Sequence, residues 1–213
     1  MVFVKAIVID DDPFVRSSLT AGLAHYGIKV VRSFENGSET EQTINDEKID
    51  VVIVDLDLGP GPSGIDICTA MRRNHSGIGL VLLTSYQDPR IFDPGAPSLP
   101  KGTKFISKSE LSDFRLLVDA VFAAKSKPLI PMKRGENTNN PLTANQLEVL
   151  KMVAQGLSSQ EIADNKGVSV KAIEGTISKI QAAVGINKSK SMNQRVQLAR
   201  IYYMMSGKKP PGA

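Results

Sequence analysis

Acidic residues follow two apolar runs of the sequence directly, in the segments Asp10-Asp11-Asp12 and Asp55-Leu56-Asp57. Carboxylates that converge on one crevice repel one another unless a cation lies among them, and a ligand set made of oxygen atoms suits Mg²⁺. Two further apolar runs lead to Thr84 and Lys108, whose hydroxyl and ammonium groups can bind anionic oxygens. Such a set can transfer a phosphoryl group to an aspartate, because metal and lysine neutralise the phosphoryl oxygens while the carboxylate attacks.

These residues can meet only if the apolar runs form one parallel sheet. The runs are Ala6–Ile9, Ile28–Val31, Val51–Val54, Leu80–Leu83 and Lys104–Ile106. Between them lie segments in which apolar residues recur at helical spacing, for example around Leu19 and Leu23. Alternating strands and helices predict an α/β fold, a doubly wound parallel sheet of five strands covered on both faces. Ligands of such sheets bind beyond the carboxyl ends of the strands, where the candidate residues stand.

The order and spacing of these residues resemble the receiver domain of two-component response regulators, over about residues 2–125. The resemblance implies a flavodoxin-like sheet in which Asp55 accepts the phosphoryl group from a histidine kinase. It also implies roles for the surrounding residues: Mg²⁺ is held by Asp10, Asp11, Asp55 and the backbone carbonyl of Asp57, while Thr84 is the switch hydroxyl, Phe105 the aromatic that reorients and Lys108 the phosphate-binding lysine.

One alternative shares part of this chemistry. The run Val51–Asp57 also resembles the nucleophile motif of haloacid-dehalogenase-type phosphatases, in which the second aspartate is a general acid. Those enzymes need a further acidic pair downstream to hold the metal. Here the pair lies upstream, at Asp10 and Asp11, and no comparable pair follows Lys108. The receiver interpretation is therefore favoured, and we do not expect a metabolic enzyme.

The segment after Thr84 departs from the receiver pattern. It contains four prolines between residues 89 and 100. Each proline removes a backbone N–H group and restricts the residue before it, so the fourth helix is predicted to be short or missing. Receivers of this type usually signal through that helix, which leaves open a transcription regulator whose control does not depend on phosphorylation.

The net charge of +4 averages two unlike halves. Residues 1–125 carry 13 Lys and Arg against 17 Asp and Glu, a net charge of −4, whereas residues 126–213 carry 13 against 5, a net charge of +8. A basic half of this kind suggests a nucleic-acid partner. The single Cys68 cannot form an internal disulfide, and neither a signal peptide nor an apolar stretch of about 18 residues is present, so we expect a cytoplasmic protein without a membrane partner.

The proline-bracketed residues 126–140 are interpreted as a linker, and residues 141–206 as a small all-α domain. Capping boxes begin helices at Thr143 and Ser158, and Gly167 marks a tight turn before the next helix, a helix-turn-helix arrangement. The string Ala154-Gln-Gly-Leu-Ser-Ser-Gln-Glu-Ile-Ala163 resembles the LuxR-type DNA-binding domain. A receiver joined to this domain is typical of the NarL/FixJ class of response regulators. Residues 207–213 are expected to be a disordered tail.

The resemblance also implies which residues meet DNA. Glu174, Gly175 and Ser178 occupy positions that face base edges, and Lys171 and Lys179 lie near phosphates, as we also expect of Lys188 and Lys190. The last helix, about 192–205, carries more apolar surface than one neighbour can cover. We therefore expect the active protein to be a homodimer that recognises a palindromic operator.

Overall fold

The computed structural model describes residues 4–86, 89–92, 99–130, 141–186 and 193–207. The chain divides into two compact units. The N-terminal unit comprises residues 1–84 and 97–135, and the C-terminal unit comprises residues 85–96 and 136–213. The short segment that follows Thr84 therefore belongs to the C-terminal unit. The predicted domain boundaries at 125 and 141 do not include the assignment of residues 85–96 to the C-terminal unit.

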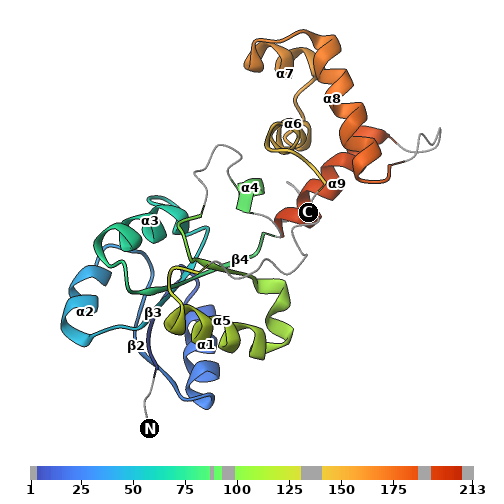
Figure 1. Cartoon of the computed structure of the whole chain (residues 1–213). Helices are drawn as coiled ribbons and strands as arrows, with labels where there is room; N and C mark the ends of the chain where they lie inside the picture. The colour runs from blue at the N-terminus through green and yellow to red at the C-terminus, as the bar shows by residue number, and fades with distance from the viewer. Residues whose placement is uncertain (1–3, 87–88, 93–98, 131–140, 187–192, 208–213) are drawn as a thin grey trace. The chain divides into compact units, whose positions relative to one another are not determined.

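The N-terminal unit contains the predicted sheet of five parallel strands (Figure 1). They are β1 (Val4–Ile9), β2 (Ile28–Phe34), β3 (Val51–Asp55), β4 (Gly79–Thr84) and β5 (Lys104–Ser107). The order is β2-β1-β3-β4-β5, that of a flavodoxin-like doubly wound sheet, so the predicted fold class is confirmed. All residues of β3 and β4 are buried, which explains their continuous apolar sequence.

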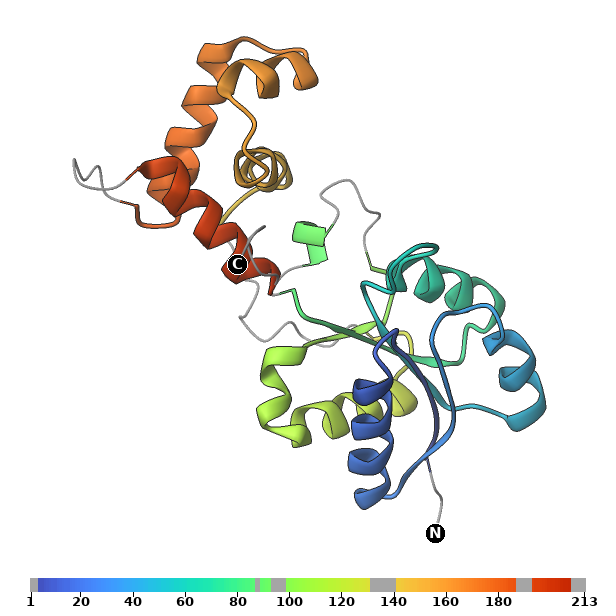
Figure 2. The ribbon, with the colours of Figure 1, turned by 180° about the vertical axis from the view of Figure 1, so that it is seen from behind.

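Helices cover both faces of this sheet. They are α1 (Pro13–His25), α2 (Thr40–Glu47), α3 (Gly64–Asn74) and α5 (Phe114–Ser126), with a 3₁₀ turn, η1 (Lys108–Ser112), after β5. Figure 2 shows α1 and α5 on one face and α2 and α3 on the other. Leu19, Leu23 and Leu117 are buried against the strands in the main core cluster. Cys68 is buried on the sheet-facing side of α3, and burial raises the pKa of its thiol to about 12, as befits a core residue.

The first part of the predicted linker is fixed to the N-terminal unit. The guanidinium of Arg72 donates a 2.9 Å hydrogen bond to the carbonyl of Pro128, and the buried ammonium of Lys104 donates to the carbonyl of Ile130. Gly102 leaves no room for a side chain, because a Cβ would stand 1.9 Å from the Pro128 oxygen. Residues 128–130 therefore belong to the N-terminal unit, as do residues 126 and 127 at the end of the helix α5, and residues 131–140 of the predicted linker lie outside the described residues.

The described residues from 141 onward form the four predicted helices of the helix-turn-helix domain: α6 (Ala144–Ala154), α7 (Ser159–Lys166), α8 (Val170–Ala183) and α9 (Gln194–Ser206). The predicted capping boxes at Thr143 and Ser158 are both formed, and Ser169 caps α8. Gly167 adopts a φ of 63° between α7 and α8, where a side chain would be strained. The expected tail from residue 208 lies outside the described residues.

A single turn, α4 (Pro89–Phe92), follows β4. The prediction of a short fourth helix is thus confirmed. Among the described residues no helix is both long and apolar enough to cross a bilayer.

Candidate functional site

The carboxyl edge of the sheet brings three carboxylates together. Asp10 follows β1, Asp55 is the last residue of β3, and Asp11 is the neighbour of Asp10. One oxygen of each lies within 4.8 Å of the other two. Asp10 and Asp55 are buried, whereas Asp11 is exposed. The strand-end argument thus predicts this cluster correctly, although Asp55 lies more than 40 positions after Asp10 and Asp11 in the sequence.

Lys108 enters the same cluster from the far end of the sheet. Its ammonium nitrogen lies 2.8 Å from a carboxylate oxygen of Asp10 and 3.2 Å from one of Asp55. The η1 turn that carries Lys108 begins with a capping box in which the hydroxyl of Ser107 accepts from the turn and the carboxylate of Glu110 returns the bond. The lysine is thus held at the start of a stabilised turn rather than on a free loop.

Burial makes the carboxylate of Asp55 hard to ionise without more positive charge nearby. The pKa of Asp55 is raised to about 6 by desolvation, an effect that Lys108 opposes and Asp10 reinforces. Burial alone would lower the pKa of Lys108, but the two carboxylates raise it above its ordinary value. The lysine therefore stays charged, and its single charge does not compensate the two buried aspartates.

The residues of the cluster fit a divalent cation. Oδ1 of Asp55 is buried and has no hydrogen-bond partner among the described residues. A buried carboxylate oxygen without a partner is costly, and a hard cation held by oxygen ligands would remove that cost. Asp10, Asp11 and Asp55 supply three such ligands, and Asp57, half-buried two residues beyond the acceptor, has its backbone carbonyl in the same loop.

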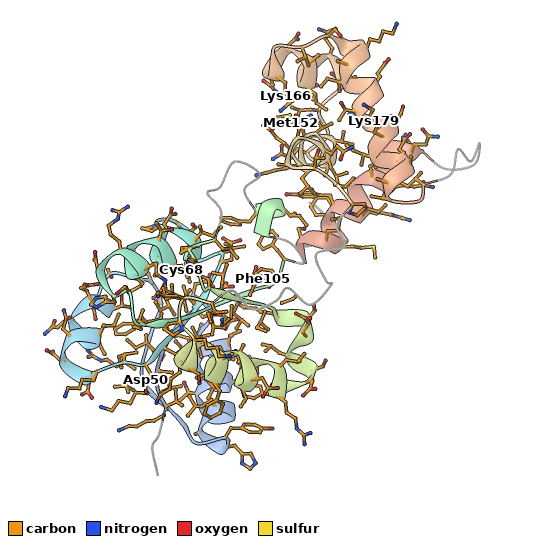
Figure 3. The ribbon with its side chains drawn as sticks, in the orientation of Figure 1. Asp50, Cys68, Phe105, Met152, Lys166 and Lys179 are labelled. Atoms are coloured by element: carbon orange, nitrogen blue, oxygen red, sulfur yellow. The ribbon has the colours of Figure 1, made fainter. Side chains whose placement is uncertain are left out.

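The two candidate switch residues lie on neighbouring strands. Thr84 ends β4 and is fully buried, and it is paired with Ser107 of β5. Phe105, labelled in Figure 3, is half-buried and stands two residues before Ser107. Because side chains alternate along a strand, Phe105 and Ser107 share a face of the sheet. The register thus places Phe105 on the same face of the sheet as Thr84.

Sequence reasoning missed two residues that shape the site. Arg16 of α1 donates hydrogen bonds of 2.6 Å and 3.0 Å to the carbonyls of Asp10 and Asp11, and so fixes the loop that carries the acidic pair. Gly64 begins α3 so close to the acceptor strand that a Cβ would stand 2.1 Å from the carbonyl oxygen of Asp55. The sequence marks this position only by a loop of glycine, proline and serine at residues 59–64.

The raised pKa of Asp55 predicts a pH-dependent stability in metal-free buffer. The folded-state pKa of Asp55, about 6, exceeds the ordinary value of 3.8, so the folded protein favours the protonated carboxyl. The contribution of Asp55 to the free energy of unfolding is therefore fully present below pH 3.8 and is lost as the pH rises through about 6. The shift corresponds to about 3 kcal/mol. Asp55→Asn is therefore expected to raise the free energy of unfolding by about 2–3 kcal/mol near pH 7.5 and to change it little near pH 4.

Denaturant unfolding across this pH range, with EDTA present, checks the prediction. The exposed Asp119 of α5 provides the matched control, because Asp119→Asn removes a carboxylate without a buried site. An equal gain in the free energy of unfolding for both variants, or a gain that does not grow with pH, would contradict the conclusion that the ionised Asp55 carboxylate destabilises the folded protein.

The candidate DNA-facing residues of α8 are all on its solvent side. Ile173, Ile177 and Ile180 are buried in the domain core. The opposite side exposes Lys171, Glu174, Gly175, Ser178 and Lys179, the last labelled in Figure 3. Beside this face lies a polar hollow of about 470 Å³, which Glu174, Ser178 and Arg195 help to line. The second helix of the helix-turn-helix pair thus presents a continuous polar surface.

Basic residues after α8 divide into two groups. Arg195 is engaged within the domain, since its guanidinium donates to Ser159 Oγ at 3.2 Å and to the carbonyl of Leu157. It therefore ties the start of α9 to the start of α7. Lys188 and Lys190 lie outside the described residues, so their predicted contacts stay predictions.

Comparisons with known proteins agree with this division of the chain. Residues 6–109 match the family model "Response regulator receiver domain", and residues 140–200 match "Bacterial regulatory proteins, luxR family". The oxygen regulatory protein NreC of Staphylococcus aureus (strain bovine RF122 / ET3-1) is 26% identical over 205 residues, which cover 87% of this chain and 93% of NreC. NreC of Staphylococcus haemolyticus (strain JCSC1435) is 26% identical over 189 residues, which cover 80% and 86%.

A solved structure of RcsB from Salmonella enterica serovar Typhimurium, bound to promoter rprA, shares the fold. It has a TM-score of 0.54 and 20% identity, and the match covers 93% of this chain and 98% of that one. Together the two family matches span most of the sequence, in the order receiver then LuxR-type domain. The chain therefore belongs to the two-component response regulators of the NarL/FixJ class, and it is a DNA-binding regulator of transcription.

Proposed function

We propose that phosphorylation of Asp55 switches the DNA binding of this regulator. A cognate histidine kinase would be the donor in a cytoplasmic regulator, and a small acyl phosphate would be an alternative donor. The observation that carries the proposal is the buried carboxylate of Asp55. One of its oxygens has no hydrogen-bond partner among the residues that the structure describes, two further aspartates lie beside it, and its other oxygen lies 3.2 Å from the ammonium of Lys108. A purely structural aspartate would not be left with such uncompensated charge.

In the proposed transfer, a carboxylate oxygen of Asp55 attacks the phosphorus, and the bond from phosphorus to the donor nitrogen or oxygen breaks. The donor leaves with that bonding pair, and the product is an acyl phosphate on Asp55. Asp10, Asp11, Asp55 and the Asp57 carbonyl would hold Mg²⁺, which supplies charge neutralisation at the phosphoryl oxygens. Lys108 pairs with a phosphoryl oxygen in place of the Asp55 carboxylate, and Thr84 donates a hydrogen bond to another.

The switch then follows from packing. Movement of Thr84 toward the phosphoryl group vacates space in a fully buried position, and Phe105 on the neighbouring strand turns into it. The resulting change would promote a homodimer that recognises a palindromic operator. The short α4 favours a second candidate function, DNA-binding regulation without phosphorylation, which the same experiment distinguishes.

The test is to incubate the full chain with a small acyl phosphate and Mg²⁺ and to measure intact mass. We expect one added phosphoryl group in the wild-type protein and in Asp57→Asn, and none in Asp55→Asn. Omission of Mg²⁺ is expected to suppress the reaction. Modification of Asp55→Asn at the same rate as the wild type, or no modification of any variant, would count against the proposal.

For the DNA contacts we propose that Glu174, Gly175 and Ser178 face base edges, with Lys171, Lys179, Lys188 and Lys190 near phosphates. Gly175 supports this assignment. It lies inside α8, where glycine costs helix stability, yet a Cβ there would have no described neighbour within 4 Å. Packing within the chain therefore does not require glycine, whereas the close approach of a base edge would.

Gly175→Ala is accordingly expected to separate stability from function. It should stabilise the domain by about 0.5–1 kcal/mol and weaken specific DNA binding, since the added methyl group projects into the interface. Thermal unfolding and fluorescence anisotropy with a duplex selected by the protein measure the two effects. Ala182→Gly, at an exposed position near the end of the same helix, is the control and should lose stability without losing affinity. Unchanged or tighter DNA binding by Gly175→Ala would remove Gly175 from the interface.

A further inference from the structure

The residues that follow the switch position are packed into the DNA-binding unit. Ser85, Tyr86 and the single turn α4 group with residues 136–213 rather than with the sheet they leave. Within this unit α4 contacts α6 and α9 (Figure 1). The segment formed by Ser85, Tyr86 and α4 is called the docking segment below.

Packing rather than local sequence preference holds α4 in place. A helix of four residues is not stable on its own, because the entropy lost in its first turn is not recovered. Ile91 is nevertheless only 1% exposed, and Tyr86 only 3%. The rings of Tyr86 and Phe92 meet edge to face, with centroids 5.5 Å apart. The docking segment thus has its own small apolar contact inside the helical unit.

Two polar or close contacts fix the ends of this segment. The ammonium of Lys151 on α6 lies 3.4 Å from the carbonyl oxygen of Phe92, to which it donates. At the other end, a Cβ built on Gly207, just after α9, would lie 3.2 Å from the Cβ of Ser85. The segment is therefore attached to both helices, and neither attachment uses the exposed polar face of α8.

We propose that the docking segment is the physical coupling between the phosphoryl-acceptor site and the DNA-binding unit. Thr84, the candidate switch residue, is joined to Ser85 by one peptide bond. A displacement of Thr84 would therefore be transmitted along the chain to α6 and α9, with no need for a full fourth helix. The contacts described above show that the docking segment packs on α6 and α9. Its role in switching rests on the proposed phosphorylation of Asp55.

A disulfide can test this coupling in the full chain. A Cβ built at position 207 lies 3.2 Å from the Cβ of Ser85 and 2.8 Å from its carbonyl oxygen. A small backbone shift at Gly207 therefore brings the two Cβ atoms to the separation of natural disulfides, about 3.5–4.5 Å. The double variant Ser85→Cys with Gly207→Cys should therefore cross-link under mild oxidation. The native Cys68 is fully buried and should not interfere. The single variants Ser85→Cys and Gly207→Cys are the matched controls, the second also for strain at the positive φ of Gly207.

The readout is the ratio of DNA affinities of the phosphorylated and unphosphorylated protein, measured before and after reduction. We expect the oxidised double variant to accept the phosphoryl group yet show no change in affinity, and to recover the response when the disulfide is reduced. Failure of the cross-link to form would overturn the docking. A cross-linked protein that still responds to phosphorylation would overturn the coupling. If the wild type itself shows no response, the proposed function fails, and cross-link formation still decides the docking.

Discussion

Lys108→Met is expected to slow phosphoryl transfer to Asp55 by about 100-fold or more, since removal of one preordered charged donor from a transition state typically costs that much. The lysine lies 2.8 Å and 3.2 Å from the buried carboxylates of Asp10 and Asp55, so it is already in place when the phosphoryl group arrives. Methionine keeps the length of the side chain and removes only its charge and donors.

Metal binding should respond in the opposite direction. Without the ammonium group the two buried carboxylates lose a competing cation, so Lys108→Met is expected to bind Mg²⁺ at least as tightly as the wild type. The rate is measured from intact mass against time with a small acyl phosphate, and metal affinity by calorimetry. Lys125→Met is the matched control, because Lys125 forms an ion pair with Asp50, at an N–O distance of 3.0 Å, and takes no part in the candidate site. Equal rates for the two variants would exclude Lys108 from the transfer.

Gly64→Ala is expected to have the largest effect on folding. A Cβ at this position would stand 2.1 Å from the carbonyl oxygen of Asp55 and 2.9 Å from the Cα of Leu56. Both neighbours are buried backbone atoms, in the last residue of β3 and the residue after it, so they cannot turn aside as a flexible side chain would. The start of α3 must move away from β3, which we expect to cost about 3 kcal/mol or more.

The same displacement should disturb the acceptor site, so phosphoryl transfer should fall along with stability. Denaturant unfolding and the mass assay measure the two losses. Gly77→Ala is the control, because a Cβ there has no described neighbour within 4 Å. A stability of Gly64→Ala within about 1 kcal/mol of that control would show that the contact relaxes easily.

The sheet could be predicted because each central strand is buried on both faces and so reads as an unbroken apolar run. Prediction was weaker at the edge of the sheet. The apolar run of β2 ends at Val31, yet the strand continues through Arg32 and Ser33 to Phe34. An edge strand has only one neighbour and tolerates exposed polar side chains, so Arg32 and Ser33 interrupt the apolar run before the buried Phe34.

Sequence spacing likewise predicts some residues of the candidate site and not others. Residues at strand ends, such as Asp10, Asp55 and Lys108, follow from topology alone, because all five strands are parallel and end at one edge. Arg16 lies inside α1, and nothing in its spacing shows that the long side chain turns back to two backbone carbonyls. Such contacts depend on how an element is oriented, which tertiary packing decides.

The segment after Thr84 combines a feature that the sequence predicts with one that it does not. Its prolines predicted the loss of the fourth helix, because the effect of proline on the backbone is local. The burial of Ile91 in the C-terminal unit could not be predicted, because α4 packs on α6 and α9, and α6 begins 53 positions after Ile91. Short segments of this kind take their structure from the surface on which they pack.

The most direct test of the account is the affinity of the full chain for a selected DNA duplex, with and without a small acyl phosphate and Mg²⁺, in the wild type and in Asp55→Asn. The account predicts that phosphorylation raises the DNA affinity of the wild type and leaves that of Asp55→Asn unchanged. An equal affinity of the phosphorylated and unphosphorylated wild type, or an equal gain in the variant, would contradict it.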